Sequence, residues 1–530
     1  MAGKISLLDC TLRDGGYLND WNFGNGTMTC VFDRLNEAGV DVIEIGFLDQ
    51  RQPFSIDRTI QPNTEGMSAA FSKVADKKAK VVAMIDYGTC DIENIQQKKE
   101  TIIDGIRVIF KKENMHKAIA FGKQIMERGY ELFLNMVSIT SYEDKDMIEF
   151  CDAANKIKPL AVSLVDTYGL MHKEQMFHYF GMLDKYLDSA VTIGYHSHNN
   201  FQLAYSNTIE MLRLETKRDL IVDGTLYGMG KSAGNAPIEL LAMHLNENYG
   251  KKYDINQILE AIDIDIMPMY EKHYWGYGFL FYLSAKNDCH PTYVDHLIKK
   301  RTLSIKAVNE ILGKITPELK LKFSKQHIEE LYMEYLLENV DDSDDIDALT
   351  KKLCEKELLI LGPGASVSAE KETILEHLDG KIVIAVNFIP DDIRTDYFFI
   401  SNPKRYSRMV PQQTDRMNAE VIATSNITPI AGKFDYTVDY GKLVSENDEI
   451  WDNALVILLN LLKKMGVRSV SLAGFDGFSE KAEMNYVDKG LDLSKNFDYL
   501  SAVNALLKKK LKEYRGDLNI TFLTRSLYED

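Results

Sequence analysis

The stretch I-S-L-L-D-C-T-L-R-D-G-G, from Ile5 to Gly16, joins a short apolar run to a polar turn that carries Arg13 and Asp14. Seven further apolar runs rich in β-branched residues follow it, at 42–46, 80–85, 106–110, 131–138, 160–166, 191–196 and 220–225. Helical stretches separate these runs, and eight strands that alternate with helices are what a (β/α)₈ barrel requires. The sequence therefore predicts an α/β protein whose first unit, residues 1–250, is a TIM barrel.

Polar residues end nearly every one of these runs. In a barrel of this kind the C-terminal strand ends form the mouth of the active site, so side chains from distant runs converge there. The residues that we expect at this mouth are Asp9, Arg13, Glu44, Asp86, Asn135, Asp166, His196 and Asp223.

The segment H-S-H-N-N, from His196 to Asn200, ends the seventh run. Two residues apart on a strand, His196 and His198 point to the same face, so both imidazoles can reach one ion. Asp14 adds a carboxylate from the first run, and this donor set suits Mn²⁺, Mg²⁺, Co²⁺ or Zn²⁺ with positions left open for substrate. Arg13, which is always charged, offers a rigid fork of donors for a carboxylate or an enolate oxygen.

Four motifs resemble the DRE-TIM metallolyase (HMGL-like) superfamily over residues 1–300: T-L-R-D-G, I-E-I-G, H-S-H-N-N and G-M-G-K-S-A-G-N-A-P. The last motif, from Gly228 to Pro237, is most similar to that of the 4-hydroxy-2-oxovalerate aldolases. The resemblance implies a divalent ion, Mn²⁺ first among the candidates, and an enolate mechanism. It implies metal ligation by Asp14, His196 and His198, with Asn235 at or just beyond the ligands, a substrate-holding Arg13, and a supporting Glu44.

One departure from the aldolases concerns the acid/base residue. Those enzymes carry a histidine where this chain has Tyr17, and a tyrosine has an unperturbed pKa of about 10. The base therefore stays open, and the candidates are Tyr17, Tyr277, Tyr282, His273 and His290, the last of which is otherwise a loop or core histidine. Candidate substrate contacts are Asp166, Tyr277 and Tyr282, with a loop-positioning role as the alternative for Asp166.

The second half of the chain has a different pattern. We expect a helical extension over 251–339, an acidic linker over 340–350, and a Rossmann-like three-layer α/β domain over 351–530. The strand and glycine turn from Glu357 to Ser366 could cradle a phosphate, or could be a purely structural turn. The domain resembles, more weakly, sialyltransferase-like and hydroxymethylpterin-pyrophosphokinase-like Rossmann proteins. That resemblance implies a cleft for a nucleotide or a nucleotide sugar, lined by Gly364, Ser366, Asn387, Asn402 and Lys404.

Composition limits the partners. A net charge of −17 disfavours nonspecific nucleic-acid binding, which needs a basic surface. No run approaches the roughly 20 apolar residues that cross a bilayer. Six scattered cysteines and a first segment without a hydrophobic signal core indicate a cytoplasmic protein, which we expect to be a homo-oligomer.

These observations favour a divalent-metal-dependent aldolase or lyase that joins or cleaves a pyruvate-type 2-oxo acid and an aldehyde, in surface-glycan or unusual-sugar synthesis. The chain has no cysteine between Cys151 and Cys289, where CoA lyases carry one in the loop after strand eight. Two alternatives stay open. One is acyl transfer from acetyl-CoA, as in isopropylmalate synthase, and the other is a non-catalytic barrel whose C-terminal domain uses a nucleotide sugar.

Overall fold

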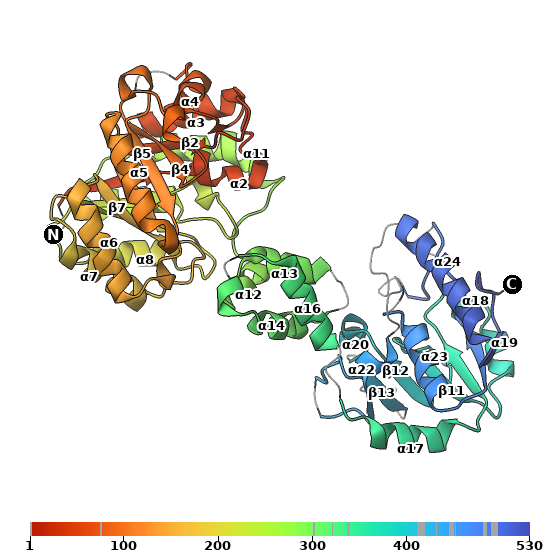
Figure 1. The fold of residues 1–530 in the computed structure, drawn as a ribbon. Helices are drawn as coiled ribbons and strands as arrows, with labels where there is room; N and C mark the ends of the chain where they lie inside the picture. The colour runs from red at the N-terminus through yellow and green to blue at the C-terminus, as the bar shows by residue number, and fades with distance from the viewer. Residues whose placement is uncertain are drawn as a thin grey trace. The chain divides into compact units, whose positions relative to one another are not determined.

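The structure is a computed structural model. It describes residues 3–74, 77–299, 303–320, 322–336, 340–410, 419–430, 432–444, 450, 452–480, 485–488 and 497–529. The chain forms two compact units, Met1–Pro291 and Thr292–Asp530, whose elements are labelled in Figure 1. Each unit is described by itself below.

Eight parallel strands close on themselves in the first unit. β1 pairs with both β2 and β9, and this double pairing closes the barrel. The strands are β1 (Ile5–Asp9), β2 (Val42–Leu48), β4 (Lys80–Asp86), β5 (Gly105–Phe110), β6 (Glu131–Met136), β7 (Ala161–Asp166), β8 (Thr192–Ser197) and β9 (Leu220–Gly224), with β3 (Ile60–Gln61) beside β2. Each of the eight predicted runs forms one of these strands, so the TIM-barrel prediction is confirmed.

Amphipathic helices connect the strands. Helix α5 (Met115–Glu127), for example, buries Ala118, Ile119 and Ile125, which lie on one face at helical spacing. The other described α-helices of this unit are α1 (Thr11–Asp14), α2 (Gly16–Asn19), α3 (Asn25–Glu37), α4 (Thr64–Ala70), α6 (Asp144–Ile157), α7 (Lys173–Tyr186), α8 (Ala204–Leu212), α9 (Ile238–Tyr249), α10 (Ile255–Ala261), α11 (Met267–Tyr270) and α12 (Phe279–Lys286), and the π-helix η6 (Ile262–Ile266) joins α10 to α11.

Seven parallel strands form the sheet of the second unit. They are β10 (Leu358–Leu361), β11 (Ile382–Val386), β12 (Tyr397–Ile400), β13 (Glu420–Thr424), β14 (Tyr436–Val438), β15 (Ser469–Ala473) and β16 (Asn519–Phe522). Their order is β14-β13-β12-β11-β10-β15-β16, so the direction of winding reverses at β10. This is the α/β domain with a parallel sheet that the sequence predicts.

Helices accompany this sheet along the chain. One hydrophobic cluster joins the strands to three helices. It contains Val367 of α18 (Ser366–Ala369), Ile374 of α19 (Lys371–Glu376) and Met409 of α20 (Pro403–Met409). The described helices of the unit are α13 (Pro291–Lys299), α14 (Ile305–Gly313), α15 (Pro317–Lys320), α16 (Lys325–Leu336), α17 (Ser343–Leu353), α18 (Ser366–Ala369), α19 (Lys371–Glu376), α20 (Pro403–Met409), α22 (Tyr440–Leu443), α23 (Ala454–Lys464) and α24 (Phe497–Tyr514). No described helix is long and apolar enough to cross a membrane.

The acidic segment 340–350, which we expected to be a linker, is structured. Most of it belongs to helix α17, which buries Ile346, Leu349 and Leu353 on one face. Asp342 is also buried, and its carboxylate accepts the backbone N–H of Asp439 at 3.0 Å. The acidic residues that suggested a solvated linker lie at the N-terminal end of the helix, where negative charge is stabilising. The boundary between the two units along the chain falls after residue 291, inside the expected helical extension.

Candidate metal and enolate site

Two charged side chains, those of Arg13 and Asp14, follow the end of β1 at the mouth of the barrel. The N–H of Asp14 donates to the carbonyl of Cys10 at 2.8 Å, which makes the tight turn of α1. Arg13 Nε donates to Glu44 Oε2 at 2.8 Å, and Arg13 Nη1 donates to Asp14 Oδ1 at 2.5 Å. Arg13 is only 4% exposed, so these two carboxylates fix the plane of its guanidinium.

The end of β8 brings the two histidines to the same place. Asp14, His196 and His198 offer ligand atoms that all lie within 4.8 Å of one another. The imidazole centroids of His196 and His198 are 5.2 Å apart, and their planes are at 85°. One divalent ion can therefore be bound by all three side chains, as the spacing of the motifs predicts.

The loop after β9 completes this arrangement. Asn235 Nδ2 donates to Asp14 Oδ2, and the backbone of Asn235 forms a bridge with that of His198. Gly230 lies against the same pair, so a Cβ there would collide with the Asn235 amide and the Asp14 carboxylate. Asn235 Oδ1 and His198 Nδ1 are buried without a hydrogen-bond partner in the described part of the chain. Buried acceptors left without donors fit a cation between them.

Arg107, from β5, is a site residue that the sequence analysis missed. Its side chain is 0% exposed, with Nη1 at 3.1 Å from Glu44 Oε2 and Nη2 bonded to Asp223 Oδ2. Asp223 in turn contacts His196 Nδ1 at 3.1 Å. A continuous chain of charges thus links Arg13 to His196. The chain contains two guanidiniums and three carboxylates, so one negative charge is in excess, which favours binding of a cation. The groups are Arg13, Arg107, Asp14, Glu44 and Asp223.

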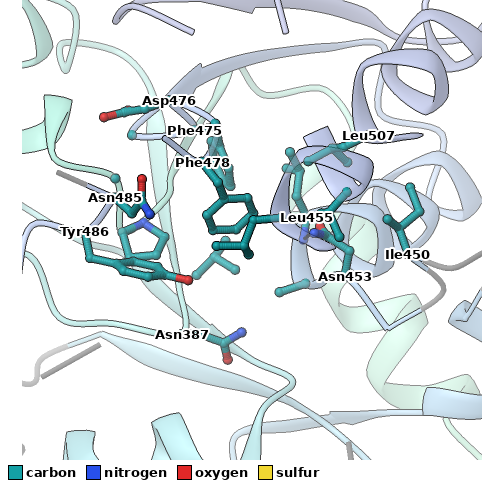
Figure 2. A pocket seen from close by; sticks show the side chains of 18 of the residues that line it. Asn387, Ile450, Asn453, Leu455, Phe475, Asp476, Phe478, Asn485, Tyr486 and Leu507 are labelled. Atoms are coloured by element: carbon teal, nitrogen blue, oxygen red, sulfur yellow. Dashed lines mark hydrogen bonds between the residues drawn. The ribbon is translucent and has the colours of Figure 1, made fainter. Parts of the chain in front are cut away.

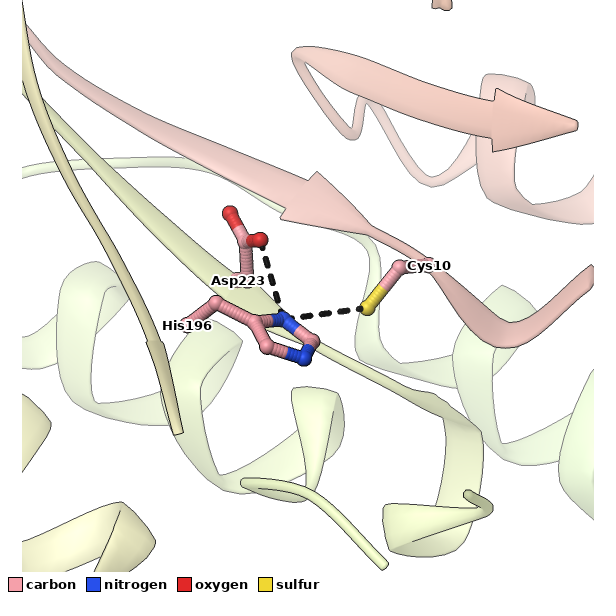
Figure 3. Close-up of side chains that lie close together, drawn as sticks. All are labelled: Cys10, His196 and Asp223. Atoms are coloured by element: carbon pink, nitrogen blue, oxygen red, sulfur yellow. Dashed lines mark hydrogen bonds and ion pairs between the residues drawn. The ribbon is translucent and has the colours of Figure 1, made fainter. Parts of the chain in front are cut away.

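A second group of possible ligands, Cys10, His196 and Asp223, shares one histidine with the first (Figure 3). In it, Asp223 Oδ2 and the Cys10 thiol lie on the Nδ1 side of His196, at 3.1 and 3.9 Å. Burial raises the pKa of the Cys10 thiol well above its ordinary value, so the sulfur stays protonated and is a poor metal ligand. We therefore assign Asp223 to orienting the ring of His196, whose Nε2 then remains for the ion.

The protonation states also suit a metal site. Burial lowers the pKa of His198 to about 4, and the nearby His196 and Arg13 act in the same direction. Burial by itself would raise the pKa of Asp14, but Arg13 and the two histidines hold it well below the usual range. At neutral pH these groups are a neutral imidazole and a carboxylate, the forms that bind metal.

The pKa values of Tyr17 and His290 decide which of them can donate or accept a proton near neutral pH. Burial raises the pKa of Tyr17 to about 12, so this phenol can donate a proton but is a poor base near neutral pH. The Lys231 ammonium lies 5.3 Å from the centre of the Tyr17 ring. Burial, Lys231 and Lys111 lower the pKa of His290, which is therefore neutral at pH 7.

The remaining predicted site residues of the barrel unit do not belong to the group of Asp14, His196 and His198. Both carboxylate oxygens of Asp166 accept backbone N–H groups of its own loop, from Leu170 at 2.9 Å and Met171 at 3.1 Å. Asp166 therefore holds its own loop in place. Tyr277 is 54% exposed and His273 is also exposed, whereas the ring of Tyr282 lies 6.2 Å from that of Phe201, just after H-S-H-N-N.

In the second unit, three of the predicted nucleotide-binding residues, Gly364, Asn387 and Asn402, line a cavity. Ser366 does not line it, because it is fully buried and bonded to Asp476 and Thr524. Lys404 is exposed and does not line it either, but its neighbour Arg405 does.

The closed (β/α)₈ barrel places a carboxylate and two imidazoles beside a fixed arginine, a set of side chains that can bind a divalent ion next to an anionic substrate. Residues 4–264 match the HMGL-like family model, and this part of the chain is an HMGL-like domain of the DRE-TIM metallolyase superfamily.

Relatives with assigned functions cover about half of the chain. A 4-hydroxy-2-oxovalerate aldolase from Marinomonas is 24% identical over 51% of this chain and 80% of its own length. An oxaloacetate decarboxylase from Mycobacterium tuberculosis is 26% identical over 52% of this chain and 82% of its own. The solved N-terminal domain of a putative aldolase from Bacteroides vulgatus is 25% identical, covers 55% of this chain and 96% of that one, and has a TM-score of 0.47.

Proposed function

We propose that this protein is a divalent-metal-dependent aldolase or lyase that acts on a pyruvate-type 2-oxo acid through an enolate. The observation that carries the proposal is the convergence of Asp14, His196 and His198 beside Arg13. A divalent ion bound there, Mn²⁺ first among the candidates, would act as a Lewis acid toward the keto and carboxylate oxygens of the substrate.

Arg13 is the residue that we assign to the enolate. Its Nε and Nη1 are held by Glu44 and Asp14, whereas Nη2 has no hydrogen-bond partner among the residues that the structure describes. A charged donor that is already fixed in place stabilises the negative charge that develops on the enolate oxygen, without reorganising during the reaction. Glu44 Oε1, also buried without a partner in the described chain, can accept a hydrogen bond from a water molecule at the site.

We assign proton transfer to Tyr17 and His290. His290 is neutral at pH 7, and the charge of Lys231, which lies over the Tyr17 ring, lowers its pKa. We therefore assign to it the removal of the proton from the hydroxyl group whose carbon becomes the aldehyde. Tyr17 keeps its proton and can donate it to the enolate carbon. His290→Gln should therefore lower turnover, whereas the exposed His273→Gln should leave it unchanged.

The names of the two relatives support cleavage of the bond between C3 and C4 of a 2-oxo acid. An aldolase that cleaves a 4-hydroxy-2-oxo acid and a decarboxylase that acts on oxaloacetate both form pyruvate enolate. We include in the proposal a role in surface-glycan or unusual-sugar synthesis, in which the aldehyde partner would derive from a sugar.

The test is pyruvate release by the Mn²⁺-loaded full chain from 4-hydroxy-2-oxo acids and from oxaloacetate, and condensation of pyruvate with an aldehyde panel that includes sugar-derived aldehydes. His198→Ala should lose the ion and the activity. His178→Ala, in which an exposed histidine paired with Asp144 is removed, should keep both. Equal metal content in the wild type and in His198→Ala would refute the site. Release of free thiol from acetyl-CoA without pyruvate chemistry would favour acyl transfer instead.

A further inference from the structure

The second unit has a cavity at the carboxyl ends of its central strands. Loops after β10, β11, β12 and β15 line it, and the winding of the sheet reverses at β10. In open α/β sheets, ligands bind at such a reversal, in the crevice outside the carboxyl ends of the strands. The cavity has a volume of about 210 Å³ and is partly open to solvent.

One side of this cavity is aromatic and apolar. The rings of Phe478 and Tyr486 have centroids 6.2 Å apart with their planes at 64°. Figure 2 shows Phe478 in the middle of the cavity, with Tyr486 on one side and Leu455 and Leu507 on the other. Phe478 is only partly buried, so one part of its ring remains available to a planar group. Such a surface favours stacking of a flat heterocycle.

Another part of the lining consists of amide side chains that hydrogen bonds with the backbone hold in place. Asn387 has a positive φ of 58°, and its Oδ1 accepts the backbone N–H groups of Ser401 at 2.9 Å and Asn402 at 3.3 Å. Asn402 in turn caps helix α20, accepting the N–H of Lys404 at 3.0 Å. These bonds fix the polar side of the cavity before any ligand arrives, which reduces the ordering that binding requires.

The glycine turn after β10 does not offer the phosphate cradle that its sequence suggests. Asp476 Oδ2 accepts the N–H of Ser366 at 2.8 Å, and Asp476 Oδ1 accepts its hydroxyl. A carboxylate of the protein therefore already occupies the position that a phosphate would take. Arg405 is the only lysine or arginine among the described residues that line the cavity, and its guanidinium lies 4.8 Å from the centre of the Tyr486 ring.

We propose that this cavity binds a nucleoside monophosphate group, either free or as the nucleoside phosphate part of a nucleotide sugar. The base stacks against Phe478 and Tyr486, and the phosphate pairs with Arg405. One guanidinium beside one aromatic face suits a flat heterocycle joined to a single dianionic group. This site is independent of the barrel, so the proposed lyase activity can fail without affecting it.

Calorimetry on the full chain tests the proposal with CMP, UMP, AMP and GMP, their uncharged nucleosides, and CMP- and UDP-linked sugars as probes. At least one nucleotide should bind below about 1 mM, and more tightly than its nucleoside. Phe478→Ala should weaken binding about tenfold or more, because stacking contributes to both ligands. Arg405→Gln should reduce the affinity for the nucleotide to that for the nucleoside and leave the nucleoside unchanged, which also shows that the variant is folded.

Lys404→Gln is the matched control, since it removes the adjacent but exposed cation and should change nothing. Tighter binding of a nucleotide sugar than of the free monophosphate would identify the second source. Three results would each overturn the proposal: no binding by any probe below about 1 mM, equal binding of nucleotide and nucleoside by the wild type, or binding that survives Phe478→Ala.

Discussion

Replacing Arg107 by methionine should destabilise the barrel unit by about 4 kcal/mol at pH 7. The side chain is 0% exposed and lies 3.1 Å from Glu44, so at an effective dielectric constant of about 20 this single contact is worth about 5 kcal/mol. The loss has an upper limit, because a buried carboxylate that loses its partner can take up a proton instead. Protonation at pH 7 of an aspartate with an unperturbed pKa costs about 4 kcal/mol, and this is an upper limit for Asp223 without Arg107, because burial raises the pKa of that carboxyl group.

The assay is denaturant unfolding followed by tryptophan fluorescence in a Trp451→Phe background, which leaves Trp21 and Trp275 as reporters, both in the barrel unit. The deficit of the Arg107 variant should shrink as the pH falls toward 4, since the carboxyl group then protonates without cost. Arg213→Met is the control, because it removes a surface pair with Glu210 and should cost less than about 1 kcal/mol. A deficit no larger than that of the control, or one that does not depend on pH, would refute this account of the network.

Three further changes test the site. Arg13→Lys keeps the charge but loses the planar fork of donors, so turnover should fall by about a hundredfold or more. The metal content, measured by elemental analysis, should stay the same. Near wild-type turnover would remove Arg13 from the mechanism. Gly230→Ala places a methyl group against Asn235 and Asp14, so the affinity for the metal should drop. The far-ultraviolet circular dichroism spectrum should stay that of the wild type. An unchanged metal affinity would contradict the close contact. In the folded, metal-free protein His198 is neutral, because burial lowers its pKa from 6.5 to about 4. The free energy of unfolding should therefore decrease as the pH drops through that interval, by up to about 3 kcal/mol. His198→Gln should flatten that pH dependence, and an unchanged pH profile would show that the histidine is not buried in its neutral form.

The barrel, and the convergence of the candidate metal ligands, were predictable from the sequence because they depend on local signals. Short β-branched runs separated by helical stretches define the strands, and each polar group at a strand end is adjacent to its run. H-S-H and R-D therefore identify His196, His198, Arg13 and Asp14 without any knowledge of the tertiary structure.

Residues whose role comes from a distant partner were not predictable. Arg107 lies inside an apolar strand, G-I-R-V-I-F, and a charge in such a run is the one signal that could have found it. Asp476 meets Ser366 across 110 residues of chain, so nothing near the glycine turn shows that its N–H group is already taken. In α17, the acidic residues concealed an apolar stripe at helical spacing, formed by Ile346, Leu349 and Leu353.

The candidate metal ligands come from opposite ends of the barrel sequence. Asp14 follows the first strand, His196 and His198 lie at the end of β8, and Asn235 follows the last strand, β9, which pairs with β1. A ribosome must therefore release more than two hundred residues before all the groups that surround the ion exist together. The nascent chain cannot form the complete site early, and tight uptake of the ion would report that the barrel has closed.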